Sequence, residues 1–516
     1  MKEFNVTGVC VSNKHYMVDI SKKLDQIIKL IKKEKYFTIH RARQYGKTTT
    51  LSCIYKALKD NYLILKISFE GIGDYAFTTE NAFIGSFINL ISRRLHHNGL
   101  DNHIINKWEE NKNQLNKLED LSLKITELVE NTDKEIVLMI DEVDKSSNNQ
   151  LFLHFLGMLR NKYLDREEGF DSTFKSVILA GVYDVKNLKL KLRTNEEKKY
   201  NSPWNIASDF DVDMSFDSKE ISTMLLEYEK DYRTGMDIEE ISKEIYKFTS
   251  GYPFLVSKIC KIIHEKLSQN WTNTGIKDAV KLVVHEKTTL SDDLIKNLAN
   301  NSKLYESIFN QLILGEEFAY NTHNEITQIG TILGVFREED GRRIIHNKIF
   351  EELIYEYMAS EIDERERLTP YNFRSNFISK EGELNISKIL DKFQEMMKEE
   401  YSNRDKDFLE REGRLLFIAF LRPIINGIGF ALKEVQISEE RRLDILLTYN
   451  QNKYVIELKR WYGEEYHKKG LKQLNGYLES QGLNKGYLIV FDFRKEKEYK
   501  KEWIDVDGKR VYNVVV

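Results

Sequence analysis

Two short groups of residues have the types and spacing that chemistry on phosphate groups requires. The first is Gly46-Lys47-Thr48, which follows an apolar stretch and precedes an amphipathic one. The second is Asp444, followed by Glu457 and Lys459, in a segment that is otherwise mostly apolar. Short patterns of this kind also occur by chance, so the elements that position them decide what they indicate.

The first group has the surroundings of a phosphate-binding loop. Tyr36–Ile39 is a strand candidate that runs into residues 40–46, and the next segment carries Leu51, Ile54 and Leu58 on one helical face. A strand, a loop ending in Gly-Lys-Thr and a helix present backbone N–H groups and a helix N-terminus to an anion. Lys47 is expected to reach the β- and γ-phosphates, and Thr48 to hold Mg²⁺. The predicted nucleotide-binding residues are Arg43, Gln44, Tyr45, Gly46, Lys47, Thr48 and Thr49.

The loop departs from the usual pattern at its first position. In the spacing GxxxxGK[ST], the first glycine falls where this sequence has Arg41. Glycine suits that position because it tolerates positive φ and lets the backbone approach closely. Arg41 therefore predicts a slightly different path for the loop.

A second acidic motif supports the assignment of a nucleotide site. Ile136–Ile140 is a continuous apolar run that ends in Asp141-Glu142. Such a run is typical of a buried parallel strand, which would deliver the two acids at its carboxyl end. Asp141 is expected to hold Mg²⁺, and Glu142 to orient and deprotonate the attacking water. The alternative is a core strand followed by a solvated acidic turn.

Four segments together resemble the bacterial AAA-like ATPases of the STAND type, over about Val6–Leu267. They are His15–Asp19, Arg41–Thr49, Ile140–Asp144 and Ser250–Phe254. The resemblance implies bound ATP and Mg²⁺, and many members of that group also begin the loop with arginine. It also implies that Gly251 and Pro253, in a helical lid, approach the nucleotide base. An ordinary helix-breaking turn is the alternative for these two residues.

The second group of residues is predicted to lie on a hairpin. Arg441–Leu447 and Tyr454–Lys459 are strand candidates, and the period of two places Glu457 and Lys459 on one face. Buried acids are costly without partners, and a hard cation such as Mg²⁺ would supply one for Asp444 and Glu457. Lys459 would position or deprotonate a water molecule. A helix around Glu410–Phe420 offers Glu412 as a further carboxylate.

The elements downstream complete an order that is similar to the PD-(D/E)XK nuclease superfamily, over about Asp407–Phe493. The helix Lys468–Ser480 carries Gln473 and Tyr477 one turn apart, and a strand follows at Tyr487–Phe493. Their Gln-x-x-x-Tyr element looks like that of the RecB-type branch. The alternative is a half-buried hairpin with a surface Glu–Lys pair.

The resemblance to this superfamily implies roles for the residues that match its motifs. Gln473 and Tyr477 would be accessory residues near the scissile strand. Leu443 stands where the superfamily's proline would be, which makes the match less specific. The implied catalytic set is Glu412, Asp444, Glu457 and Lys459, of which Glu412, Asp444 and Glu457 would be the metal ligands.

The sequence as a whole predicts an α/β multidomain fold, with a P-loop NTPase parallel sheet, a helical lid and a winged helix before a restriction-endonuclease-like α/β domain. The predicted parts are an ATPase core (1–217), a helical lid (218–290), a winged-helix-like region (291–358), a helical linker (359–405) and a nuclease-like domain (406–516). Arg337, Arg342 and Arg343 surround the expected hairpin of the winged helix, where they would either touch phosphates or pack between domains.

Composition limits the partners. The net charge of −4 excludes a globally basic nucleic-acid coat, so contact with DNA or RNA must come from local clusters. The three cysteines suggest neither a disulfide framework nor a metal site. Met1–Val11 lacks the layout of a signal peptide, and the apolar runs are short for a bilayer, so we expect a cytoplasmic location without membrane contact.

The leading hypothesis is an ATP-gated, Mg²⁺-dependent nuclease that cleaves nucleic acid, with DNA favoured, in defence against foreign DNA or its processing. A STAND-like nucleotide switch whose C-terminal part binds nucleic acid or a partner without cutting is the second. A transcription regulator that acts through residues 291–360 is the third. The oligomeric state, including a homo-oligomer, stays open.

Overall fold

The computed structural model of the chain describes most of its residues and divides them into two compact units. Described are residues 2–146, 149–182, 204–312, 317–366, 377–379, 382–401, 416–418, 420–421, 424–425, 429–438, 441–449, 452–494 and 498–516. Residues 145–146, 359–366, 399–401, 429–438 and 441–444 are described by their backbone alone. The first unit comprises Met1–Leu290, Asn321–Glu338 and Ile344–Lys348, and the second Ser291–Tyr320, Glu339–Arg343 and Ile349–Val516.

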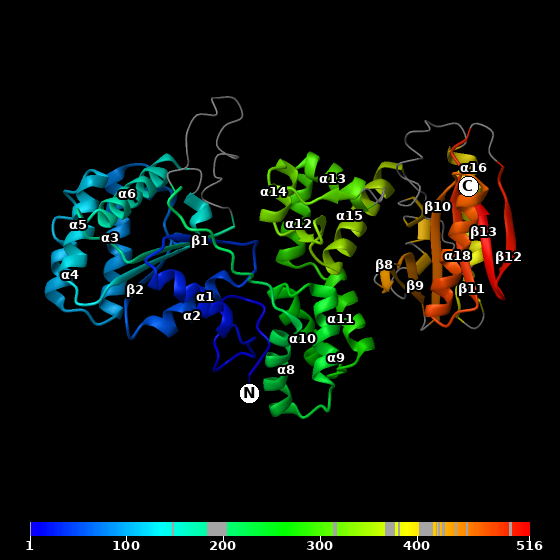
Figure 1. The fold of residues 1–516 in the computed structure, drawn as a ribbon, viewed down its shortest axis with the longest axis horizontal. Helices are drawn as coiled ribbons and strands as arrows, with labels where there is room; N and C mark the ends of the chain where they lie inside the picture. The colour runs from blue at the N-terminus through cyan, green and yellow to red at the C-terminus, as the bar shows by residue number, and fades with distance from the viewer. Residues whose placement is uncertain are drawn as a thin grey trace. The chain divides into compact units, whose positions relative to one another are not determined.

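The first unit is built on a parallel sheet (Figure 1). Its strands are β1 (Phe37–His40), β2 (Leu63–Ser68), β3 (Ile136–Asp141) and β4 (Ser176–Gly181), in the order β1-β4-β3-β2. Every position of β3 and β4 is buried, as expected for strands covered on both faces. β1 and β3 lie within one residue of the predicted positions, because apolar runs mark such strands clearly.

Helices cover both faces of this sheet (Figure 1). The helices over one face are α3 (Glu80–His97), α4 (Asn102–Glu109), α5 (Leu118–Glu130) and α6 (Gln150–Glu167), and α1 (Ser21–Lys32) and α2 (Lys47–Leu58) cover the other. The larger core forms where Leu65, Leu138 and Leu179 of the strands meet Phe83 and Phe155 of the helices. Burial of these side chains fixes the sheet and therefore the loops at its carboxyl edge.

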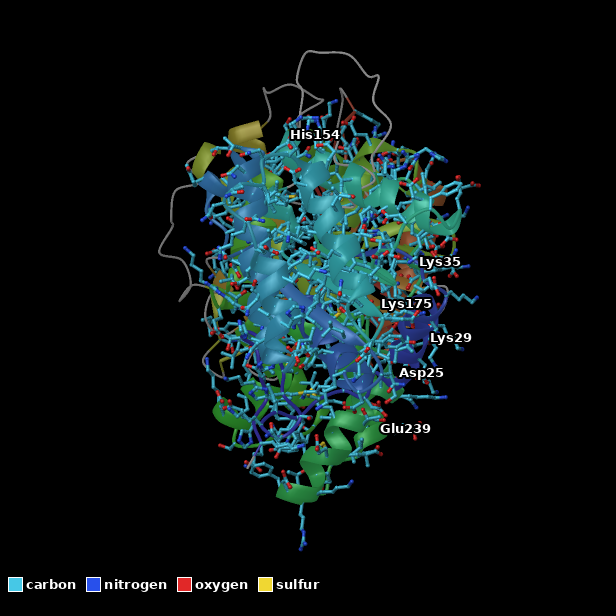
Figure 2. The ribbon with its side chains drawn as sticks, turned by 90° about the vertical axis from the view of Figure 1, so that its left-hand side faces the viewer. Asp25, Lys29, Lys35, His154, Lys175 and Glu239 are labelled. Atoms are coloured by element: carbon cyan, nitrogen blue, oxygen red, sulfur yellow. The ribbon has the colours of Figure 1, made fainter. Side chains whose placement is uncertain are left out.

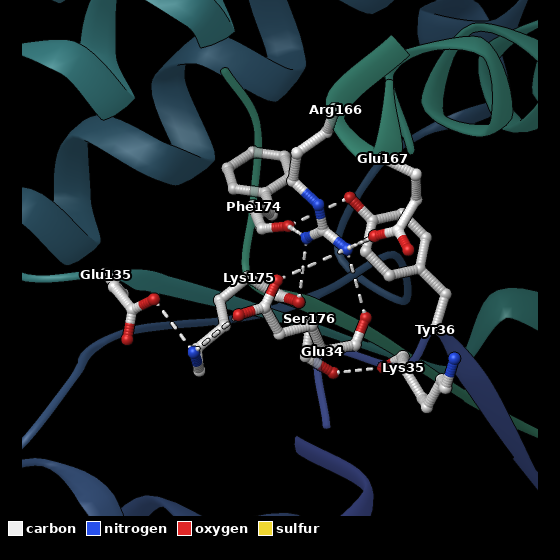
Figure 3. Close-up of polar contacts among 9 residues, drawn as sticks. All are labelled: Glu34, Lys35, Tyr36, Glu135, Arg166, Glu167, Phe174, Lys175 and Ser176. Carbon is white, nitrogen blue, oxygen red and sulfur yellow. Dashed lines mark hydrogen bonds and ion pairs between the residues drawn. The ribbon is translucent and has the colours of Figure 1, made fainter. Parts of the chain in front are cut away.

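A polar network closes the amino edge of the sheet (Figure 3). Arg166 of α6 donates to the carbonyl oxygens of Phe174 (2.7 Å) and Glu34 (3.2 Å). Lys175, which Figure 2 shows at the side of this unit, pairs with Glu34 (3.2 Å) and Glu135 (2.8 Å). Most of these residues lie just before the strands, so the contacts at the amino edge of the sheet stabilise the fold.

A helical region follows the sheet. Its helices are α8 (Ser218–Tyr232), α9 (Ile238–Thr249), α10 (Pro253–Lys266) and α11 (Asn273–His285). Asp217 and Glu220 form a capping box at the start of α8, and Pro253 occupies the first position of α10. Gly251 has a φ of +71°, and a Cβ there would lie 1.9 Å from the carbonyl oxygen of Phe216. The turn before α10 is therefore pressed against the segment that leads into α8.

The hairpin expected after Gly334 is present. The elements of this region are α12 (Thr289–Ala299), α13 (Ser302–Leu312), β5 (Phe318–Ala319), α14 (Glu325–Ile332), β6 (Phe336–Glu339), β7 (Arg342–Ile345) and α15 (Lys348–Glu366), and the strand order is β5-β7-β6. Arg343 is buried, donates to Ser307 Oγ (2.7 Å) and stacks over the Phe318 ring. Arg343 therefore packs inside the protein and is not exposed to contact a phosphate.

The second unit contains a mixed sheet of six strands (Figure 1). They are β8 (Gly429–Ser438), β9 (Arg441–Tyr449), β10 (Asn452–Arg460), β11 (Lys485–Phe491), β12 (Lys501–Val506) and β13 (Lys509–Val515), in the order β12-β13-β11-β10-β9-β8. β9 and β10 form the expected antiparallel hairpin, with Ile445 opposite Ile456. β10 and β11 are parallel and are joined through α18 (Glu464–Ser480), as a parallel pair requires.

The helices α18 and α16 (Ile386–Tyr401) lie on opposite faces of this sheet. α18 packs Leu471 and Leu474 against Val455 of β10. On the other face, α16 donates from Gln394 Nε2 to the carbonyl oxygen of Val515 (2.7 Å). The charge pattern placed α16 in a linker, but its buried apolar residues pack against the sheet.

No helix among the described residues combines the length and the apolar composition that crossing a bilayer requires.

Candidate functional site

The loop between β1 and α2 ends in a left-handed residue. Gly46 has a φ of +79° and is the N-cap of α2, which explains why glycine stands there. Lys47 is buried, and its Nζ donates to the carbonyl oxygens of Arg41 (2.9 Å) and Ala42 (3.0 Å). Burial lowers the pKa of Lys47, although nearby acids oppose the shift. The ammonium group is thus held inside the loop.

The acids that act on Lys47 come from the end of β3. Asp141 is buried, and the N–H of Glu142 donates to its Oδ1 (3.0 Å). Burial, followed by the charge of Asp141, raises the pKa of Glu142, while Lys47 lowers it. Because all the strands are parallel, the ends of β1 and β3 share one edge of the sheet. Lys47, Asp141 and Glu142 therefore gather as the motifs predict.

Thr48 and Thr49 begin α2. The Thr48 carbonyl accepts from Lys66 Nζ (3.3 Å), and Thr49 Oγ1 accepts from the backbone N–H of Cys10 (3.2 Å). Burial lowers the pKa of Lys66, and the charge of Asp141 acts against that shift. Lys66 was not among the predicted site residues; a lysine inside the apolar run of β2 was the available signal.

Arg41, at the position where glycine is usual, is turned to the side of the loop. Its Nη2 donates to the carbonyl oxygen of Val212 (2.7 Å), and the guanidinium lies 5.5 Å from the centre of the Phe210 ring. Phe210 in turn stacks on Phe37 of β1. Arg41 therefore ties the loop to the segment that leads into the helical region.

The middle of the loop is held by three side chains that enclose it. Tyr45 is buried, and its hydroxyl is 2.6 Å from Ser215 Oγ and 2.8 Å from His346 Nε2. Tyr252 donates from its hydroxyl to the carbonyl oxygen of Arg43, and its ring meets the Tyr45 ring edge-on at 4.6 Å. Thus Tyr252 is the residue of the Gly-Tyr-Pro turn whose side chain reaches the loop. It lies between Gly251 and Pro253, the two residues predicted to approach the nucleotide base.

His346 and Tyr252 were not among the predicted site residues. Their partners are more than 200 positions away in sequence, so no local pattern marks the contact. An aromatic side chain between Gly251 and Pro253 was the one available hint. Gly334 also approaches the loop, because a Cβ there would lie 2.5 Å from Ala42 Cβ.

The residues at this edge fit a nucleotide and its metal. The helix α2 offers unpaired N–H groups at its start, and Lys47 is a desolvated cation beside them. Asp141 and the Thr48 hydroxyl are hard oxygen donors of the kind that Mg²⁺ accepts. Gln44 donates to Thr289 Oγ1 (2.6 Å) at the outer side of the loop.

The second unit brings Glu457 and Lys459 together on β10. The Glu457 side chain is 1% exposed and the Lys459 side chain 21%, and Lys459 Nζ lies 2.8 Å from Glu457 Oε1. Lys459 faces α18, because a Cβ at Gly470 would lie 3.4 Å from Lys459 Cγ. Glu457 is two positions earlier on the same strand and therefore faces the same side. The predicted alternation is correct for these two residues, and the pair is not at the surface.

The other predicted metal ligands of this unit can be located only in part. Glu412 lies outside the described residues, and Asp444 is described by its backbone alone. Ile445 pairs with Ile456, so the next position of the same register sets Asp444 across from Glu457. Within the described part of the chain, no group of three or more His, Cys, Asp or Glu side chains is arranged to hold a metal ion.

Gln473 and Tyr477 interact directly on α18. Gln473 Nε2 donates to the Tyr477 hydroxyl (2.6 Å). The Tyr477 ring is fully buried and packs in the core with Val455 and Leu488. Tyr477 therefore positions Gln473, the more accessible of the two.

Comparison with known proteins places this chain in a family. Residues 7–356 match the model of the AAA-like domain, which is more than half of the 516 residues. The chain belongs to the AAA-like domain family and therefore carries an AAA-like P-loop ATPase domain. The match ends before β8, so it does not include the site on β10.

Individual relatives are distant. The uncharacterized WD repeat-containing protein slr0143 of Synechocystis is 23% identical over 222 residues, which are 38% of this chain and 17% of that protein's length. The Walker-type ATPase PABY2304 of Pyrococcus abyssi matches with a TM-score of 0.48 and 14% identity, over 68% of this chain and 99% of that one. The ORC2 protein of Aeropyrum pernix in its ADPNP–ADP complexes has a TM-score of 0.36 and 13% identity, over 69% and 98%.

Proposed function

We propose that this protein is an ATP-dependent nuclease, whose second unit cleaves nucleic acid with Mg²⁺ and whose first unit binds and hydrolyses ATP. The observation that carries the nuclease part is the buried pair of Glu457 and Lys459 beneath α18. A buried ion pair of this kind seldom stabilises a fold more than apolar residues of the same volume would. Its presence in the middle of an apolar face therefore calls for a functional reason.

The residues of the second unit suit phosphodiester hydrolysis. Asp444 and Glu457 would hold Mg²⁺, with Glu412 as a further ligand. The bound ion would supply charge stabilisation at the phosphate and a lower pKa for the attacking water. Lys459 would hold that water and offset negative charge on the phosphate, while Gln473 would orient the substrate strand. DNA is the favoured substrate.

The residues of the first unit suit ATP hydrolysis. Lys47 would exchange its two loop carbonyls for the β- and γ-phosphates, and Thr48 and Asp141 would hold Mg²⁺. Glu142, which has a raised pKa, would accept the proton of the attacking water.

Cleavage by the full-length protein tests the nuclease proposal. With Mg²⁺ and labelled DNA or RNA, the wild type should cut, and Lys459→Ala, Glu457→Gln and Asp444→Asn should each slow cutting by about a hundredfold or more. Glu479→Gln and Lys485→Ala change exposed charges of the same unit and serve as matched controls. Unchanged cutting by the three variants, with unchanged melting temperatures, would show that the catalytic assignment is wrong.

A nucleotide switch that does not cut is the second candidate. The observation in its favour is the set of hydrogen bonds that tie the loop to its surroundings, made by Arg41 of the loop and by Tyr252 and His346 outside it. Tightly retained ADP after purification, slow ATP turnover and no metal-dependent cleavage would support this candidate over the first.

A further inference from the structure

Aromatic and basic side chains gather where β10 and β11 end in the second unit. They are Arg460, Trp461, Tyr462, Tyr466, Phe493 and Arg494, which we call the aromatic–arginine cluster. None of them belongs to the predicted catalytic set. Residue 460 directly follows Lys459, so the cluster adjoins the proposed cleavage site.

The cluster is organised as two stacks. Tyr462 lies beside the Arg460 guanidinium (4.9 Å from the ring centre) and meets the Tyr466 ring at 5.2 Å. In the other stack, the Arg494 guanidinium lies 5.1 Å from the centre of the Trp461 ring. The Arg494 guanidinium is itself fixed by the buried carboxylate of Asp492, with contacts of 2.7–3.1 Å. The Arg494 guanidinium is thus held against the Trp461 ring by a contact within the protein.

Two rings of the cluster are unusually exposed. The exposed fraction is 62% for Tyr462 and 45% for Tyr466. They are neighbours, whereas an isolated exposed aromatic residue would need no explanation. Arginine and tyrosine together are typical of surfaces that bind planar, negatively charged partners.

Basic side chains accompany the cluster. Lys468, Lys469 and Lys472 are exposed on α18, the helix that also carries Tyr466. Glu464 and Glu465 lie on the first turn of that helix, and the carboxylates of Asp492 and Glu498 act on Arg494. Cations and acids therefore both lie around the exposed rings, and the whole chain has a net charge of −4.

We infer that the aromatic–arginine cluster stacks unpaired bases and that the substrate of the second unit is single-stranded nucleic acid. Exposed rings can stack on a base only where its face is open, and in a duplex those faces are already covered. Tyr462 is three residues beyond Lys459, which spans at most about 10 Å of extended chain. A base on Tyr462 would thus lie within a few nucleotides of the phosphate at Lys459. The choice of substrate rests on the proposed function, whereas the stacking itself does not require cleavage.

Binding without cleavage tests the inference. The full-length protein in EDTA is titrated into three fluorescent 12-mers. One is single-stranded DNA, the second is the same sequence in duplex form, and the third is a single-stranded abasic oligomer. The single strand should bind tightest, and Tyr462→Ala/Tyr466→Ala should weaken it by about tenfold or more. Tyr462→Phe/Tyr466→Phe should retain affinity within about twofold, because the ring is what stacks. The abasic oligomer should bind the wild type and the alanine variant equally.

A matched variant and two outcomes make the test decisive. Tyr75→Ala/Tyr246→Ala removes two exposed tyrosines from the first unit and should leave binding unchanged. Equal affinity of the wild type and the alanine variant for single strands overturns the inference, as does tighter binding of the duplex or no binding of nucleic acid at all. If the wild type cuts but the wild type and the alanine variant bind single strands equally, the nuclease proposal stands and the stacking inference is wrong. If binding depends on the tyrosines but nothing is cut, the stacking inference stands and the nuclease proposal is wrong.

Discussion

His346 is a buried histidine whose ring contacts the nucleotide loop. Burial, followed by the charge of Arg337, lowers its pKa to about 4, and Asp213 opposes the shift only in part. Its Nε2 is hydrogen-bonded to the Tyr45 hydroxyl, and its ring meets the Tyr252 ring edge-on. The imidazole is therefore neutral at physiological pH, and protonation would place a charge inside the wall of the loop.

This neutral histidine predicts a pH dependence of stability. The pKa of His346 is lower in the fold than the value of about 6.5 expected after unfolding, so its contribution is complete above pH 6.5 and is lost as the pH falls toward 4. Between pH 7 and pH 5, the wild type should lose about 2 kcal/mol more stability than His346→Gln. Urea denaturation of both proteins at the two pH values measures the difference, and parallel losses would contradict it.

The turn before α10 has no room for a side chain at Gly251. Gly251 combines a φ of +71° with a backbone contact to Phe216, whereas Gly235 has a φ of +75° and open space around it. Gly251→Ala should therefore cost roughly 2–5 kcal/mol, from backbone strain and overpacking together. Gly235→Ala should cost only about 1–2 kcal/mol, from strain alone. Equal losses in urea denaturation would show that the contact contributes nothing.

The sequence predicts elements well where each is marked by a local pattern. The strands β1 to β4, the hairpin of β9 and β10 and the crossover helix α18 all follow from apolar periodicity and turn residues. Lys47, Asp141 and Glu142 meet because parallel strands share one carboxyl edge, which is a consequence of topology that the motif order already implies.

Contacts made across the fold could not be predicted in the same way. Tyr252, His346 and Lys66 reach the loop from elements whose docking depends on the packing of the whole first unit. Likewise, β8, β12 and β13 were not predicted, because charged residues interrupt or precede their apolar residues, unlike the continuous apolar run of β11.

The chain carries its two candidate sites in different compact units. Lys47→Ala should remove ATP hydrolysis, because in the proposed function the lysine would contact the transferred phosphate, and Lys459→Ala should remove cutting. If ATP gates the nuclease, added ATP should change the cutting rate of the wild type and leave that of Lys47→Ala unchanged. Rates measured with and without ATP decide this, and an identical response of both proteins would contradict gating.

The inward-folded ammonium of Lys47 has a consequence for ligand discrimination. Since it already satisfies two loop carbonyls, an arriving phosphate replaces existing bonds instead of filling an empty position. The enthalpic gain from phosphate alone is correspondingly small. Inorganic pyrophosphate should therefore be a poor competitor, and the adenosine moiety must supply much of the affinity that lets the protein tell ATP from the abundant free anions around it.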